Sequence, residues 1–225
     1  MSIPNNPGEA ASYAKRVTAQ VPALADLHRM TGILMAEHVP DKGRVIVLGA
    51  GGGLELRALA TRHPDWQFDG IDPSPSMLAQ AVQTLGPHAE KVILHQGYID
   101  TAPTGPFDGA VCLLTLHFLP RDERLQTLRE LASRLRPGAP LVVAHHSFPK
   151  EHGQDDIWLR RNAALGASGN TSKAHAEQGI RTMKERLPAL SPEEDEQVLR
   201  EAGFDDIRLF FAAFTFKGWV SRRSG

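Results

Sequence analysis

Residues 49–53 contain four glycines in five positions, directly after the β-branched run of residues 44–48. A helical pattern begins at Leu54. Glycines at a strand-to-helix turn let the backbone bend sharply and approach a bound nucleoside without a Cβ in the way. The N–H groups of the turn and the positive end of the helix then face polar ligand atoms. The segment therefore predicts a ligand-binding loop, although glycine loops of this kind are common.

An acidic residue, Asp72, follows the next predicted strand, residues 67–71. It lies about 20 residues beyond the glycine loop, where a carboxylate can accept hydrogen bonds from both hydroxyls of a ribose. The alternative is that Asp72 only caps the helix that follows Pro73. Ser or Asn would serve equally well as a cap. We therefore favour the ribose-binding interpretation.

Histidines follow two later predicted strands. His117 comes after residues 109–116, and His145 and His146 come after residues 141–144. A histidine beside the ligand can remove a proton from an oxygen or nitrogen nucleophile near neutral pH. The alternative is a packing or capping role. We take His117 as the catalytic candidate and His145 as a substrate contact, and we predict no metal, because no third ligand has suitable spacing.

The elements that hold these residues alternate between strand and helix patterns. Strands are predicted at residues 44–48, 67–71, 91–95, 109–116 and 141–144, and helices at residues 54–62, 76–85 and 121–135. Continuous apolar strands separated by helices indicate a doubly wound α/β fold, with a mostly parallel sheet covered on both faces. Ligands of such sheets bind beyond the carboxyl ends of the strands.

The flanking segments complete a single predicted domain, residues 1–225. Residues 1–40 form an N-terminal lead-in with helices at 10–20 and 23–38, and residues 148–190 are too long for a surface loop, which favours a helical lid or insertion. A helix with an N-cap serine and a proline at its first position covers residues 192–202. Residues 204–211 and 215–220 then predict a closing hairpin at the sheet edge.

The charge balance disfavours nucleic acid as a partner. The formal net charge is −1 and the pI is about 6.8, so no global positive field would gather a polyanion. No apolar run reaches the ~18 residues that cross a bilayer. The first residues also lack a basic segment followed by an apolar core. We expect a cytoplasmic protein with a small-molecule substrate and no membrane contact, and a homodimer stays open.

Taken together, four segments resemble the successive motifs of the class I S-adenosylmethionine (SAM)-dependent methyltransferases: residues 49–53, 70–78, 107–108 and 136–141. The resemblance implies a Rossmann-like sheet of seven strands with the last strand antiparallel, and SAM as the cofactor. The implied cofactor contacts are Gly49, Ala50, Gly51, Asp72, Pro73, Met77, Gly97, Tyr98, Ile99 and Leu113. NAD-dependent dehydrogenases share the glycine loop and the ribose acid, but Pro73, Met77 and the closing hairpin favour a SAM enzyme.

Two positions depart from the family pattern. Val47 stands where the first strand normally carries an acid, two residues before the first glycine. Glu55 either compensates by reaching the amino group of the cofactor or is a helix-stabilising acid of the first turn. Tyr98 follows Gly97 where an acid for the adenine amino group is usual, so the adenine is expected to meet Tyr98 and Ile99 instead.

A narrower resemblance is to the carboxy-SAM synthases, which act in tRNA wobble-uridine modification. It rests on residues 20–22, 115–119, 181–183 and 214–218. In that branch an arginine of the insertion binds the added carboxylate, and Arg181 falls near the matching place; a guanidinium suits a carboxylate. The alternative is that Arg181 is a solvated arginine on an amphipathic helix. Leu24 also stands where that branch has a tyrosine that is expected to hold the cofactor.

Three hypotheses follow from these residues. The first is a SAM-dependent methyltransferase that acts on a small molecule. The second is an enzyme like the carboxy-SAM synthases, which would convert SAM itself into a heavier cofactor when prephenate is supplied. The third is a non-catalytic SAM-binding protein.

Overall fold

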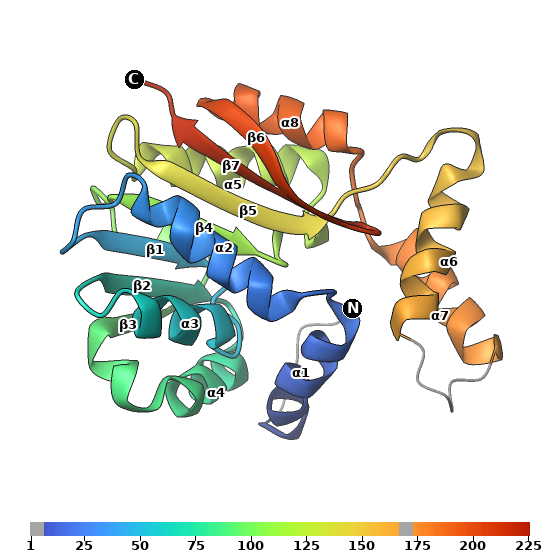
Figure 1. Cartoon of the computed structure of the whole chain (residues 1–225), viewed down its shortest axis with the longest axis horizontal. Coiled ribbons are helices and arrows are strands. Elements are labelled where there is room, and N and C mark those ends of the chain that lie inside the picture. The colour runs from blue at the N-terminus through green and yellow to red at the C-terminus, as the bar shows by residue number, and fades with distance from the viewer. Residues whose placement is uncertain (1–6, 167–172) are drawn as a thin grey trace.

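A seven-stranded sheet runs through the centre of the protein in a computed structural model that describes residues 7–166 and 173–225 (Figure 1). The strands are β1 (Arg44–Leu48), β2 (Gln67–Asp72), β3 (Val92–Gln96), β4 (Gly109–Leu113), β5 (Pro140–His146), β6 (Phe204–Ala213) and β7 (Phe216–Arg223). Their order is β3-β2-β1-β4-β5-β7-β6, and β7 runs antiparallel to both of its neighbours. The predicted Rossmann-like methyltransferase fold is therefore confirmed, including the antiparallel last strand.

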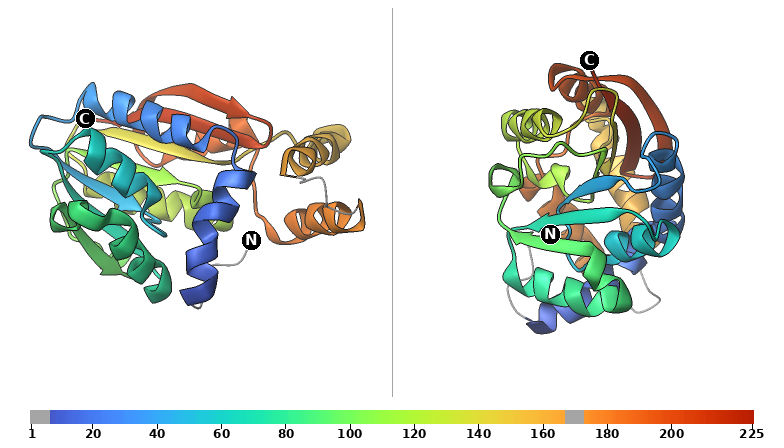
Figure 2. Two further views of the ribbon diagram at one scale, coloured as in Figure 1. Left: turned by 60° about the horizontal axis from the view of Figure 1, so that its bottom comes forward. Right: turned by 90° about the vertical axis from the view of Figure 1, so that its left-hand side faces the viewer.

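Helices cover both faces of the sheet (Figure 2). They are α1 (Pro7–Gln20), α2 (Leu24–Ala36), α3 (Leu54–Arg62), α4 (Pro75–Leu85), α5 (Arg121–Ser133), α6 (Gln154–Gly166), α7 (Lys173–Arg186) and α8 (Pro192–Glu201). Along β1, Val45 and Val47 pack in the core beneath α2 and α3, whereas Ile46 and Leu48 pack in the core beneath α5 and α8. This strict alternation follows from the two-residue period of a strand. The central strands β1, β4 and β5 are consequently buried on both faces, whereas the edge strands β3 and β6 are partly exposed.

The fifth strand is longer than predicted, because it pairs with β7 as far as His146 opposite Phe216. The prediction that both histidines follow this strand was therefore wrong: His145 and His146 are its last two residues. Side chains of neighbouring strand residues point to opposite faces. His145 consequently lies on the α5 and α8 side, and His146 lies on the α2 side.

The fourth strand is shorter than predicted and ends at Leu113. Leu114 adopts a positive φ of 58°, a conformation that an extended strand cannot continue. A short 3₁₀ turn (Leu116–Phe118) follows and carries His117. The early end of β4 also leaves the last two residues of β5 without a parallel partner, since the β4–β5 register stops at Leu113 opposite Ala144.

The helical insertion stands to one side of the sheet, at the right of Figure 1. Its helices α6 and α7 share a small core of Phe148, Leu159, Ile180 and Ala189. The segment leaves and re-enters the sheet at one point, because Ser147 and Leu190 form an isolated bridge and the N–H of Phe148 donates to the Leu190 carbonyl. The insertion is thus packed mainly on itself.

Parts of two predicted segments lie outside the described residues: residues 1–6 of the lead-in and residues 167–172 of the insertion. Over the two described ranges, no helix is both long and apolar enough to cross a membrane. Nor, within residues 7–166 and 173–225, do three or more His, Cys, Asp or Glu side chains gather as a metal site would require.

Candidate functional site

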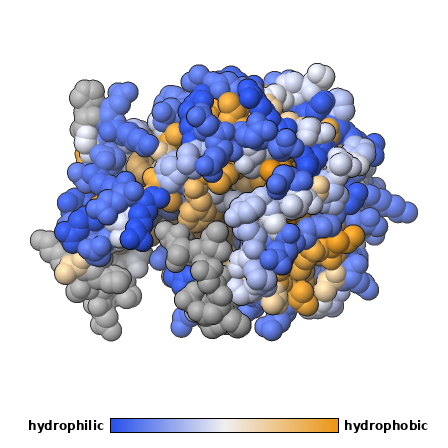
Figure 3. Space-filling model, turned by 180° about the vertical axis from the view of Figure 1, so that it is seen from behind, coloured by the Kyte–Doolittle hydropathy of each residue, from blue (hydrophilic) through white to orange (hydrophobic). Residues whose placement is uncertain are grey.

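A cavity of about 630 Å³ lies beyond the carboxyl ends of β1, β2, β4 and β5. Its wall continues from the glycine loop, past α1 and α2, to the insertion helices α6 and α7. Figure 3 shows apolar surface exposed in the region where the insertion meets the body of the protein. A volume in the range of about 300–1,000 Å³ is typical of small-molecule sites. The cavity therefore has room for a cofactor and an acceptor side by side.

The glycine loop forms one end of the cavity, and its conformation requires glycine. Gly49 has a φ of +75°, and a Cβ there would lie 1.9 Å from Thr115 Oγ1. The N–H groups of Gly49 and Ala50 donate to the Ile71 carbonyl at 2.8 and 2.9 Å, which holds the turn against β2. Gly51 lines the cavity with a φ of +48°, whereas Ala50 is fully buried behind the wall. The loop thus presents bare backbone to a ligand.

The carboxylate of Asp72 lies at the tip of β2 on the same wall. Its Oδ2 accepts the N–H of Gly51 at 2.9 Å, and its Oδ1 accepts the N–H of Ser74 at 2.9 Å. Burial raises the pKa of Asp72, and these two backbone donors partly oppose that rise. Ser74, not Asp72, caps α4 by accepting from Met77. Each carboxylate oxygen keeps a free lone pair, which fits a ribose diol.

Glu55 and Tyr13 join Asp72 at this end of the cavity. Glu55 is buried in the first turn of α3. Burial raises its pKa to about 8, opposed by a hydrogen bond to its own backbone and reinforced by the charge of Asp72. Burial and then the charges of Glu55 and Asp72 raise the pKa of Tyr13 to about 12. This end of the cavity is therefore acidic and suits a cationic amino group.

The remaining predicted cofactor contacts also reach the cavity. Pro73 and Met77 line it beside Asp72, Leu113 lines it at the end of β4, and the segment after β3 contributes Gly97, Tyr98 and Ile99. Ile99 is buried, whereas Tyr98 is 63% exposed and lies at the rim. The structure thus brings nine of these ten predicted contacts to one wall, with Ala50 behind it.

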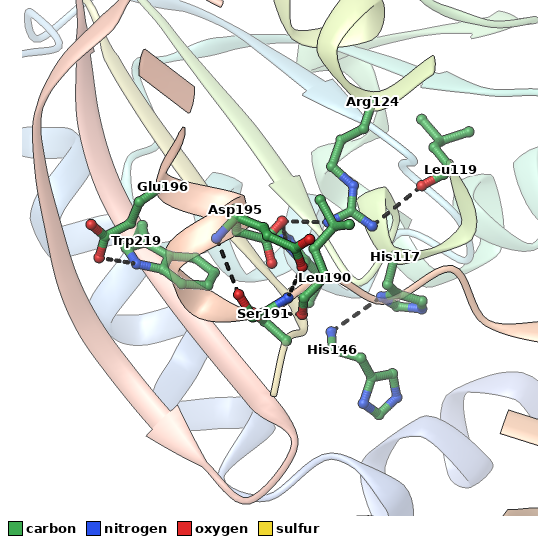
Figure 4. Close-up of polar contacts among 12 residues, drawn as sticks. His117, Leu119, Arg124, His146, Leu190, Ser191, Asp195, Glu196 and Trp219 are labelled. Carbon is green, nitrogen blue, oxygen red and sulfur yellow. Dashed lines mark hydrogen bonds and ion pairs between the residues drawn. The ribbon is translucent and has the colours of Figure 1, made fainter. Parts of the chain in front are cut away.

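The opposite end of the cavity is lined by two neutral histidines. His117 and His146 are 2% and 8% exposed, and their ring centroids are 4.9 Å apart. The backbone N–H of His146 donates to Nδ1 of His117 at 3.4 Å (Figure 4). Burial first, and then the neighbouring histidines and Arg124, hold the pKa of His117 well below its usual range. Burial, with a contribution from His145, lowers the pKa of His146 to about 3.

His145, the predicted substrate contact, lies on the other face of β5 and does not line the cavity. Its Nε2 lies 3.1 Å from Asp195 Oδ1, and Asp195 also forms a buried ion pair with Arg124 (Figure 4). Arg124 donates further to the carbonyl of Pro188, where the insertion returns to α8. Burial alone would raise the pKa of Asp195, but its contacts with His145 and Arg124 lower it. This cluster joins α5, α8 and β5.

Arg181, the other predicted substrate contact, is exposed on α7 and donates to the side chain of Gln178. Its neighbours Ile180 and Thr182 line the cavity, but Arg181 does not. Across the described part of the chain, no lysine or arginine lines the cavity wall. The insertion contributes apolar side chains together with the polar side chains of Asn162, Gln178 and Thr182, and the buried Oδ1 of Asn162 has no hydrogen-bond partner among the described residues.

Polar residues of the wall that sequence reasoning missed include Tyr13, His28 and Asn162. Tyr13 and His28 come from the lead-in helices α1 and α2, which fold back over the glycine loop. Burial, assisted by the charge of Arg57, lowers the pKa of His28 to about 4. The signal available in the sequence was the resemblance at residues 20–22, which join these two helices.

Comparison with known proteins agrees with this geometry. Residues 45–138 match the methyltransferase domain family. The carboxy-S-adenosyl-L-methionine synthase of Chromohalobacter salexigens is 27% identical over 94% of this chain and 80% of its own. Among solved structures, a putative O-methyltransferase from Nostoc punctiforme superposes with a TM-score of 0.70 and 18% identity. The match covers 96% of this chain and 59% of that protein. Human N-acetylserotonin methyltransferase, solved with SAM, superposes with a TM-score of 0.64 and 14% identity. The match covers 98% of this chain and 57% of that protein. The chain spans less than two thirds of these two solved proteins.

The fold, the glycine loop and the acid of β2 together define a Rossmann-like nucleoside-binding enzyme. Residues 45–138 carry a methyltransferase domain of the class I SAM-dependent kind, and the chain is similar to the carboxy-SAM synthases along nearly its whole length. SAM is the cofactor of this class, and the geometry of Gly51 and Asp72 fits it.

Proposed function

We propose that this protein transfers a methyl group from SAM to a small-molecule acceptor. The observation that carries the proposal is one cavity that joins an acidic, glycine-lined end to an uncharged end beneath the insertion. SAM supplies a methyl group on a positively charged sulfur, ready for in-line displacement. Gly51 and Asp72 hold the nucleoside, and Glu55 meets the amino group of the cofactor. His117 lies at the acceptor end, where holding the reactants together in a dry site accounts for most of the acceleration.

Carboxy-SAM synthesis is the second candidate, and the names of curated relatives that this chain matches along nearly its whole length favour it. An added carboxylate would need a cationic partner, because an unpaired buried charge is costly. No lysine or arginine lines the described cavity wall, and Arg181 is exposed and donates to Gln178. These observations favour methyl transfer in this chain. A location in the cytoplasm and a homodimer stay predictions, and light scattering tests the latter.

Calorimetry with SAM and with its demethylated product S-adenosylhomocysteine (SAH) tests the shared basis of both candidates. We expect binding of each, and an Asp72→Asn variant that binds SAM at least tenfold more weakly, because a hydrogen bond to a charged group contributes about 1.5–3 kcal/mol. Asp65→Asn, which removes the same charge from an exposed turn, is the matched control. An absence of heat with both ligands would leave neither candidate standing.

Mass spectrometry then separates the two candidates. Methyl transfer predicts SAH and a methylated acceptor when the enzyme is incubated with SAM and a panel of small apolar nucleophiles. Carboxy-SAM synthesis predicts a heavier cofactor when prephenate is added with SAM. A heavier cofactor, with no SAH from any acceptor, would refute the methyl-transfer proposal.

A further inference from the structure

The tautomer of His117 follows from one hydrogen bond. The register between β4 and β5 ends at Ala144, so no strand carbonyl on that side meets the N–H of His146. The N–H donates instead to Nδ1 of His117 at 3.4 Å. A ring nitrogen that accepts a hydrogen bond carries no proton, and a neutral imidazole must then carry its proton on the other nitrogen. His117 therefore has an N–H at Nε2, on a ring that lines the cavity.

The tautomer of His146 follows from its contact with Thr215. Nδ1 of His146 lies 2.9 Å from Thr215 Oγ1, and the threonine is fully buried. No other described group bonds to this hydroxyl, so its proton is satisfied only if it donates to the histidine. Leaving a buried donor unsatisfied costs about 1–3 kcal/mol. His146 therefore also carries its proton on Nε2.

Both rings stay neutral across the physiological pH range. Burial is the largest influence on each pKa, and His145 lowers both; at His117 the neighbouring His146 and Arg124 lower the pKa further. Asp195 could favour a charged ring, but it lies on the other face of β5 and is engaged with His145 and Arg124. Neutral rings whose Nδ1 atoms are occupied offer N–H donors, and they offer no free base.

We propose that His117 and His146 form a pair of neutral N–H donors that bind the oxygen of an apolar phenol or enol, and that neither acts as a general base. This proposal rests on the methyl-transfer function and names its acceptor class. Both rings line the cavity, with their centroids 4.9 Å apart, so their two N–H donors can bind one oxygen and stabilise the negative charge that develops there, as an oxyanion hole does. The insertion wall is uncharged, with apolar and neutral polar side chains and no lysine or arginine in its described part, which suits an acceptor that is uncharged in solution.

Methyl transfer to such an oxygen requires no side chain that accepts a proton. The hydroxyl of the acceptor ionises in the site, and its proton passes to water. The oxygen then forms a bond to the methyl carbon, while the bond between that carbon and the sulfur of SAM breaks with its electron pair left on sulfur. Stabilisation of the oxyanion by the Nε2–H groups of His117 and His146 replaces a base.

Nitrogen-15 NMR of histidine-labelled wild-type protein tests the tautomers without any substitution. We expect both rings to be protonated at Nε2 and to show no titration between pH 5.5 and 9. A ring that carries its proton on Nδ1, or that titrates near its ordinary pKa, overturns the proposal.

Absorbance of 4-nitrophenol bound to the SAH complex tests the acceptor class, since the ionised phenol is coloured. His117→Leu is expected to raise the pKa of the bound phenol by about 1 unit relative to the wild type, a tenfold loss of phenolate stability. His117→Gln keeps an N–H donor and should restore most of the shift, whereas a base would be lost equally in both variants. Equal effects of Leu and Gln, or no binding of 4-nitrophenol to a complex that holds SAH, refute this proposal. Failure to bind SAH at all refutes the methyl-transfer function instead.

Discussion

Replacing Glu55 with glutamine should change how the stability of the cofactor-free protein depends on pH. Burial keeps the pKa of this carboxyl at about 8 in the folded protein, against 4.5 as its ordinary value. Above pH 4.5 the unfolded chain therefore loses a proton that the folded protein retains. The free energy of unfolding must then fall as pH rises, and it levels off above about pH 8.

The size of the effect follows from these two values. One pKa unit corresponds to about 1.36 kcal/mol, and the linkage between pH 5.5 and 8.5 amounts to about 3 kcal/mol. With a urea m-value of about 3 kcal/mol/M, the unfolding midpoint of the wild type should drop by about 1 M over this range. Glu55→Gln cannot ionise and should lose this part of the slope.

Urea unfolding at both pH values, followed by circular dichroism, measures the difference. Asp65→Asn on the exposed turn serves as the control for loss of a charge and should keep the wild-type slope. If the wild type and Glu55→Gln show the same dependence on pH, the reasoning about this buried carboxyl is refuted.

Cofactor affinity gives a second measurement on the same residue. If Glu55 pairs with the amino group of SAM, its proton must leave on binding, so the affinity of the wild type should rise about 25-fold between pH 6.0 and 7.5. Glu55→Gln should bind SAM with nearly constant, weak affinity. A flat profile in the wild type would favour the alternative, in which Glu55 is only an acid of the first helical turn.

Two further predictions concern the architecture around the site. Gly49→Ala should destabilise the protein by about 2–4 kcal/mol and abolish SAM binding, because the new Cβ overlaps Thr115. Gly138→Ala, at φ +76° with open space around it, should cost only about 1–2 kcal/mol. Thermal unfolding and calorimetry compare the two variants, and equal losses of stability would contradict the steric argument. Arg124→Met leaves Asp195 buried without the Arg124 guanidinium and should lower the free energy of unfolding by about 3–5 kcal/mol. The Arg124→Met/Asp195→Leu double variant should recover most of that loss. Urea unfolding measures both variants, and a double variant no more stable than the single one would contradict this expectation.

The cofactor half of the site was predictable because its geometry is local. Gly49 and Asp72 are fixed by strands that run directly into turns, so their spacing along the chain determines their position in space. The departure at Val47 also directed attention to Glu55, which does line the cavity.

The acceptor half depended on information that a local pattern does not carry. Whether His145 or His146 faces the cavity depends on where β5 ends, and that end is set by pairing with β7, some 70 residues further on. The exposure of Arg181 depends on how α7 packs against α6, and Asn162 reaches the wall only through that packing. Long-range contacts of this kind leave little trace in a single sequence.

The closed base of the insertion has a consequence for how this enzyme could diversify. Because Ser147 and Leu190 are bridged, the chain enters and leaves the segment at one point, and the segment carries its own small core. Closing a loop of a different length at that point would cost little entropy. We therefore expect that the segment between these two residues can be replaced by one of another length or sequence. Such a replacement would change the acceptor end of the proposed site and leave the glycine loop and Asp72 in place.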